Sequence, residues 1–357
     1  MELQHVIERG MRLLPESSWR PVLQMSVDAF YAGQHDEGIT TCLILLNDPG
    51  LPAEIRELTY RNQTHYARAL ADIFDGVELR PAIAPAPPDW PIIEISHVAI
   101  EDRLLVHLRA TAPTGPEDGV VDALIALDEA LETQSVTTIG DDTGMSPRLR
   151  DIRLFLQDQT LQATALLNPE SASGHTLAAV LAFDGASWSD IVTLGPRAGN
   201  FANGWTSLAT AEGTRFLSWF EPTEIWRRDP AGECERIALR MAPHLAERFV
   251  AASQGVPISG GVLLLINESV HFDDRELVLA RFVRLDEGFQ IDAVSPQFWV
   301  SDRGQDRICG LARRADVLQI GVIHGGRASL ASVPLDAVIA RLIPVDAPGK
   351  QSQSSTE

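Results

Sequence analysis

The sequence predicts a mainly β protein in which a five-bladed β-propeller is preceded by a small helical domain. Helical periodicity is confined to the first 78 residues, a proline-rich stretch follows, and beyond it paired apolar strands recur about every fifty residues. Such hairpins fit the radial blades of a propeller, which protects most sheet edges by packing blades in a ring. A β-sandwich is the alternative, but sandwiches space their strands without this longer period.

Residues 1–78 carry the apolar stripe of amphipathic helices. After the segment "AGQHDEG" (32–38), apolar residues recur at Ile39, Cys42, Leu43 and Leu46, and Pro52 suits the first turn of a further helix. The small residues of that segment resemble the turn of a tetratricopeptide (TPR) repeat, although an ordinary helical cap fits equally. Because one repeat cannot bury its own face, we expect this TPR-like domain to pack on the propeller or on a protein partner.

Two segments bound the predicted propeller. Residues 79–91, "LRPAIAPAPPDWP", contain five prolines, which remove backbone donors and disfavour helix, so this stretch is predicted to be a stiff linker. Residues 346–357 are small and polar, which predicts a disordered tail. The propeller is therefore expected over residues 92–345.

Within 92–345 the repeat has five units, each with an apolar strand, a short polar gap and a second strand. An Asp-containing turn often follows the second strand, and no helical stretch separates the units. The first strands begin near Leu104, Leu161, Phe216, Val262 and Val317.

Composition excludes several classes of function. A formal net charge of −20 opposes binding to nucleic acid or to an anionic membrane surface. No apolar run is long enough to span a bilayer, and the first residues do not read as a secretory signal, so a cytoplasmic location is expected. The three cysteines lie far apart and no H-x-x-x-H pair occurs, so we expect neither a disulfide framework nor a metal or other cofactor.

Polar residues beside the first strand of each unit are the candidates for function, because propellers bind ligands at the mouth of the axial channel. In "RLRDIRLF" (148–155), Asp151 and Arg153 are two positions apart, so they share a face of an extended chain. The pair is either a structural salt bridge or a contact to a sugar. An adjacent guanidinium lowers the pKa of a carboxyl group, which is the opposite of what a general acid needs.

Nucleophile and phosphate-binding signatures such as G-x-S-x-G and G-x-G-x-x-G are absent. Glycoside hydrolysis needs only paired carboxylates with hydrogen-bonding neighbours. The candidate catalytic carboxylates are Asp151, Glu268 and Asp306, and Ser253 and Gln254 lie beside the fourth unit.

Across most of its length, from "FYAGQHDEG" onward, the chain resembles the helical-repeat-plus-propeller regions of bacterial glycosyltransferase-associated proteins. Their five-bladed propellers are distantly similar to β-mannoside phosphorylases and hydrolases. The family pattern G-x-E-D-P-R-L-F is matched here at Asp151, Arg153, Leu154 and Phe155. The resemblance implies that Asp151 corresponds to the general acid.

The same resemblance implies further substrate-binding positions. "NGW" is similar to the family's K-N-W, Ser253 and Gln254 to its S-Q pair, Glu268 to the acid of its H-E, and Arg281 to the arginine of its H-R-F. The implied substrate-binding residues are Arg153, Asn203, Trp205, Ser253, Gln254 and Arg281. The chain departs from the pattern at Asn267 and Ala280, where the family has histidines, and at "SHVAI" (96–100), where it has N-P-S-I.

Three functions remain open from the sequence. The eroded motifs favour a propeller that recognises a glycan or sugar phosphate with weak or absent catalysis, fused to a helical interaction segment. A working hydrolase or phosphorylase acting on mannosides through Asp151 with Glu268 or Asp306 is the second. The third is a non-catalytic scaffold that binds a protein partner through its helices.

Overall fold

The computed structural model describes residues 19–81, 89–140, 148–168, 177–194, 205–229, 232–272 and 275–345. The described chain is mainly β with few helices, as the sequence predicts. The predicted tail and most of the predicted linker, residues 82–88, lie outside the described residues. No described helix has both the length and the apolar character that a membrane span requires.

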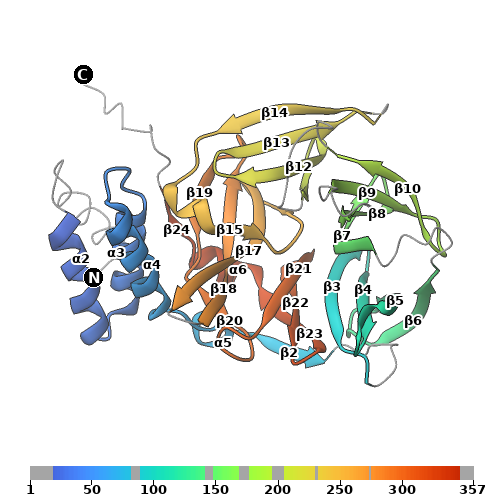
Figure 1. Cartoon of the computed structure of the whole chain (residues 1–357), viewed down its shortest axis with the longest axis horizontal. Coiled ribbons are helices and arrows are strands. Elements are labelled where there is room, and N and C mark those ends of the chain that lie inside the picture. Colours follow the sequence, from blue (N-terminus) through green and yellow to red (C-terminus); the bar gives the residue numbers. More distant parts are fainter. Residues whose placement is uncertain are drawn as a thin grey trace.

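The first four described helices belong to the N-terminal part of the chain, and α2, α3 and α4 stack beside the β domain (Figure 1). They are α2 (Trp19–Tyr31), α3 (His35–Leu46), α4 (Ala53–Thr64) and the single turn α5 (Leu70–Ile73). Gly38 of α3 lies directly against the ring of Tyr66, so the small residue permits a close approach. The likeness to a TPR repeat stays a prediction.

Three sheets follow one another along the chain, each with four antiparallel strands in sequence order. The first consists of β3 (Ile92–Ile100), β4 (Arg103–Ala112), β5 (Gly115–Leu127) and β6 (Thr133–Ile139). The second consists of β7 (Leu149–Gln157), β8 (Thr160–Leu167), β9 (Leu177–Phe183) and β10 (Trp188–Thr193). The third consists of β11 (Thr206–Thr210), β12 (Gly213–Phe220), β13 (Thr223–Arg228) and β14 (Cys234–Arg240).

A fourth four-stranded sheet combines the two ends of the chain. It contains β21 (Arg307–Arg314), β22 (Val317–His324) and β23 (Arg327–Pro334), and its last strand is β2 (Glu78–Pro81), which pairs antiparallel with β23. Figure 1 shows β2 running beside β23 at the lower edge of the β domain. Residues 79–81 of the predicted linker are therefore part of a strand, because their backbone groups complete the edge of this sheet. The short helix α6 (Leu335–Ala340) follows β23.

The remaining sheet has eight strands, and the helical segment is joined to it. The sheet is centred on the long hairpin of β17 (Gly261–Phe272) and β18 (Arg275–Asp286), and β1 (Arg68–Ala69), which follows α4, pairs parallel with its strand β20. A short 3₁₀ helix, η2 (His244–Arg248), leads into the sheet. The other strands are β15 (Phe249–Ala251), β16 (Val256–Ile258), β19 (Ile291–Val294), β20 (Phe298–Trp299) and β24 (Ile343–Pro344).

The sheets are arranged around a common axis as a β-propeller (Figure 1). Apolar side chains fill the space between neighbouring sheets. Ile95 of β3 and Leu330 of β23, for example, belong to one buried cluster. A cavity of about 440 Å³ is lined by residues from β3, β7, β11, β16 and β21, which places these strands around the axis. Four of the sheets have the four strands usual for a propeller blade.

Candidate functional site

Asp151 lies where β7 begins, at an irregularity in the strand. The register between β7 and β8 shifts between Arg150 and Arg153, and Asp151 has a left-handed backbone with φ 55°. The carboxylate of Glu94, on β3, accepts hydrogen bonds from the backbone N–H of Asp151 at 2.9 Å and of Ile152 at 3.2 Å. Glu94 thereby satisfies two donors at the shift and fixes the turn that presents Asp151.

Sequence reasoning missed Glu94. It is buried, and it stands in the otherwise apolar start of the strand "IIEIS" (92–96). A carboxylate in a buried strand needs hydrogen-bond donors. That requirement was the available signal for a structural or functional role.

Arg153 forms a salt bridge with Asp151, so the two residues do share a face. The guanidinium also donates to the carbonyl oxygen of Ala251 at 2.7 Å, which ties β7 to β15. Arg153 is buried, and its Nε and Nη1 atoms have no hydrogen-bond partner within the described protein. Asp151 keeps 28% of its side chain exposed. The pair is therefore both a structural link and a polar group that retains hydrogen-bonding capacity.

Glu268 is fully buried beneath the helical segment. Its carboxylate lies 2.9 Å from Nε of Arg281 and also accepts a hydrogen bond from Gln297. Arg281, itself buried, donates to the side-chain oxygen of Gln63 on α4 at 3.0 Å. The two predicted site residues Glu268 and Arg281 are thus brought together, as an ion pair within the sheet that Gln63 of α4 contacts.

Asp306 serves as the anchor of a loop. Its carboxylate accepts backbone N–H hydrogen bonds from Val300 at 2.8 Å and from Ser301 at 2.6 Å, and it lies 3.2 Å from Nδ1 of His324. Its side chain is only 2% exposed. These bonds account for the residue without a catalytic role.

Ser253 and Gln254 connect inner strands of neighbouring sheets. The Ser253 hydroxyl accepts from the N–H of Leu265 at 2.9 Å and donates to the carbonyl oxygen of Gln254 at 2.8 Å. The Gln254 amide donates to the carbonyl oxygen of His97 on β3. Both side chains are buried and hold the backbone of the channel wall.

Trp205 is 2% exposed and packs against Trp226 with ring centroids 5.2 Å apart. Its ring is therefore part of the core and offers no open face for stacking on a sugar. Asn203, the other residue of the "NGW" motif, lies outside the described residues.

The Asp151–Arg153 pair and Glu268 both adjoin β15. Arg153 contacts the carbonyl group of Ala251 in β15, and Phe249 of the same strand pairs with Glu268. Glu268 is held in its ion pair with Arg281. The carboxylates of Asp151 and Glu94 are instead the negative charges that act on Cys309.

The thiol of Cys309 belongs to this neighbourhood, and the residue is half-buried. Its pKa is raised to about 11, mainly by burial and in smaller part by the carboxylates of Asp151 and Glu94, against the opposing effect of Arg307. The thiolate is the nucleophile and the metal ligand, so a thiol with this pKa is inert at neutral pH. Among the described residues of this neighbourhood, Asp151 is partly exposed, and Arg153 and Asn267 have side-chain atoms without a hydrogen-bond partner.

No protein-family model and no curated protein matches the chain. Among solved structures, a glycosyl hydrolase from Bacteroides ovatus superimposes with a TM-score of 0.54 at 12% identity, over 76% of this chain and 97% of that one. A candidate glycoside hydrolase from Parabacteroides distasonis superimposes with a TM-score of 0.50 at 11% identity, over 72% and 96%. The chain has a glycoside-hydrolase-like β-propeller fold.

A β-1,2-mannobiose phosphorylase from Listeria innocua is also similar, at 13% identity and a TM-score of 0.34 over 73% of this chain and 65% of that one. At such identities the similarity concerns the fold alone. The two hydrolase superpositions support the glycoside-hydrolase-like propeller that the resemblance implies, whereas the association with glycosyltransferases stays a prediction.

Proposed function

We propose that the protein is a carbohydrate-binding five-bladed propeller with a degenerate glycosidase site, fused to a TPR-like helical segment. In this proposal the eight-stranded sheet counts as one blade beside the four four-stranded sheets, and pairing of β2 with β23 closes the ring. The similarity of the fold to glycoside hydrolases supports a sugar as the ligand.

The burial of Glu268 is the observation that carries the loss of catalysis. Glycosidases use two carboxyl groups that flank the sugar, about 5–10 Å apart depending on the mechanism. Glu268 is neutralised by Arg281 and covered by Gln63 of α4. The carboxylate of Asp306 accepts hydrogen bonds from backbone N–H groups of its own loop. Asp151 therefore lacks both of its predicted partners.

Binding is assigned to the Asp151–Arg153 pair. A carboxylate held by a guanidinium keeps lone pairs that accept hydrogen bonds from sugar hydroxyls, and the exposed part of Asp151 is positioned by Glu94. Arg153 has two unpartnered nitrogens that a small side-chain movement would offer to a hydroxyl or to an anionic sugar substituent.

Calorimetric titration of the whole chain with manno- and xylo-oligosaccharides and with sugar phosphates tests the proposal. We expect saturable binding to at least one of them, weakened tenfold or more by Asp151→Asn. Asparagine also tolerates the left-handed backbone of position 151, so the variant should fold. Asp158→Asn is the matched control, because Asp158 is an exposed residue with φ 51° at the other end of β7.

Two results would contradict the proposal. Absence of heat with every saccharide would remove the binding function. Hydrolysis of an aryl mannoside by the wild type, lost in both Asp151→Asn and Glu268→Gln with both variants folded, would show that the site is catalytic.

A further inference from the structure

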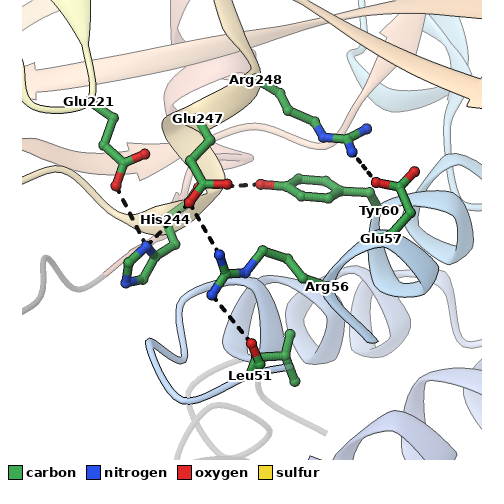
Figure 2. A network of polar contacts seen from close by, with 8 residues as sticks. All are labelled: Leu51, Arg56, Glu57, Tyr60, Glu221, His244, Glu247 and Arg248. Carbon is green, nitrogen blue, oxygen red and sulfur yellow. Dashed lines mark hydrogen bonds and ion pairs between the residues drawn. The ribbon is translucent and has the colours of Figure 1, made fainter. Parts of the chain in front are cut away.

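A second polar cluster lies at the seam between α4 and the propeller, away from the Asp151–Arg153 pair. Figure 2 shows the side chains of Glu221, His244 and Glu247 pointing toward one another. Glu221 lies in the turn between β12 and β13, and the other two residues belong to η2. A 3₁₀ helix has three residues per turn, so positions 244 and 247 fall on the same face.

The three side chains offer one ligand atom each to a shared point. Nδ1 of His244 lies 3.5 Å from a carboxylate oxygen of Glu221 and 3.5 Å from one of Glu247. All three ligand atoms lie within 4.8 Å of one another. Ligand atoms bound at about 2.0–2.2 Å to one tetrahedral or octahedral metal ion are about 3–4 Å apart. Small side-chain rotations would therefore complete such a site.

Within the described residues, one carboxylate of the cluster is paired with an arginine and the other is not. Arg56 of α4 lies 3.2 Å from Glu247, whereas within the described chain the only ion-pair partner of Glu221 is His244. Nδ1 of His244 is shielded from solvent and makes no hydrogen bond to the described residues. A cation at this point would be attracted by both carboxylates and by the imidazole lone pair.

Space is available beside the cluster. A cavity of about 30 Å³ is lined by both Glu221 and Glu247. This volume suffices for a single water molecule, which could serve as a further ligand. One imidazole and two carboxylates form a mixed nitrogen and oxygen set that suits Zn²⁺ or Mn²⁺ better than Ca²⁺ or Mg²⁺.

We propose that Glu221, His244 and Glu247 bind one first-row divalent cation, with Zn²⁺ as the preferred ion among those tested below. Arg56 and the cation compete for the same oxygen of Glu247, since the ion pair and the imidazole contact both use Oε1. Occupation of the site would therefore release Arg56, one of the links between α4 and η2 that Figure 2 shows.

Calorimetric titration of the whole chain with ZnCl₂ in a non-chelating buffer tests the proposal, with MnCl₂ and CaCl₂ as further arms. We expect one saturable Zn²⁺ site that is weakened at least tenfold by His244→Gln and by Glu221→Gln. Arg56→Gln should strengthen binding severalfold, because it removes the competing positive charge. The increase is a readout that a merely structural role of the cluster would not give.

His324→Gln is the matched control, because His324 also lies beside a carboxylate, 3.2 Å from Asp306, but beside only one. Its Zn²⁺ affinity should equal that of the wild type. Circular dichroism establishes that each variant is folded. Absence of saturable binding in both the wild type and Arg56→Gln, or equal binding by a folded His244→Gln, would overturn the proposal and leave a structural polar cluster as the explanation.

Discussion

Individual buried polar residues stabilise the first sheet through paired charges. Asp122 accepts hydrogen bonds from Arg109 at 2.8 and 2.7 Å and lies 2.9 Å from Nε2 of His107. Burial alone would raise the pKa of Asp122, but the hydrogen bonds from Arg109 and His107 outweigh it and hold the pKa well below its ordinary range. The carboxylate therefore stays charged at neutral and mildly acidic pH.

His97 makes the stability of the fold depend on pH. Burial lowers its pKa from 6.5 to about 4, against the opposing hydrogen bond to the carbonyl oxygen of Gln319 at 2.7 Å. The unfolded chain then binds a proton between pH 6.5 and 4 that the folded chain does not, so stability falls as the pH falls through this range. The pKa difference corresponds to at most about 3 kcal/mol of unfolding free energy.

Urea denaturation at pH 7.5, 5.5 and 4.5 measures this effect. His97→Gln retains a donor for Gln319 and should flatten the pH dependence relative to the wild type. His271→Gln, which changes an exposed histidine, should keep the wild-type dependence. An unchanged slope in folded His97→Gln would assign the acid sensitivity to other groups.

The elements that the sequence predicts are those whose partners are close in the chain. Hairpins such as β22–β23 are predicted by two apolar runs with a short polar gap between them. The strand β2 was missed because it is short, exposed and paired with β23 some 250 residues later, a partner that no local pattern specifies. The burial of Glu268 was missed for the same reason, since Gln63 comes from the helical segment. Asp151 and Arg153 were predictable because their spacing alone places them on one face.

At the scale of the helices, Gly38 sets how closely the chain beyond α4 approaches α3. An added Cβ at this position would fall inside the ring of Tyr66, whose hydroxyl is held by the carbonyl oxygen of Ser26. We expect Gly38→Ala to lower the unfolding free energy by about 1–3 kcal/mol, as overpacking does in cores. Chemical denaturation followed by circular dichroism measures the change.

Gly50→Ala is the control for this variant, because its added Cβ would meet only a side-chain oxygen of Asp48. Its effect should be smaller, although both substitutions remove the same flexibility from the unfolded chain. Equal stability of the two variants would show that the contact of Gly38 with Tyr66 does not limit the packing of α3.

At the scale of the whole molecule, the helices and the propeller share one hydrophobic core. Ile39 and Leu46 of α3 belong to the same buried cluster as Leu217 of β12 and Val283 of β18. Arg56 and Glu57 of α4 add ion pairs to Glu247 and Arg248 of η2 (Figure 2). The helical segment is therefore packed against the propeller as part of one structural unit. Glu268, which lies beneath this segment, is accordingly a structural group.

This arrangement predicts a single cooperative unfolding transition. The helical circular dichroism signal and the fluorescence of the tryptophans, six of which lie beyond residue 89, should change at the same denaturant concentration. Glu268→Gln should lower the free energy of unfolding by about 3–5 kcal/mol, because it leaves Arg281 buried without its counter-charge. Both signals should then change together at a lower denaturant concentration. Glu235→Gln breaks an exposed pair with Arg227, and its effect should stay below about 1 kcal/mol. Loss of the helical signal before the fluorescence change, in the wild type, would show that the helices form a separate unit and that the cover over Glu268 opens on its own.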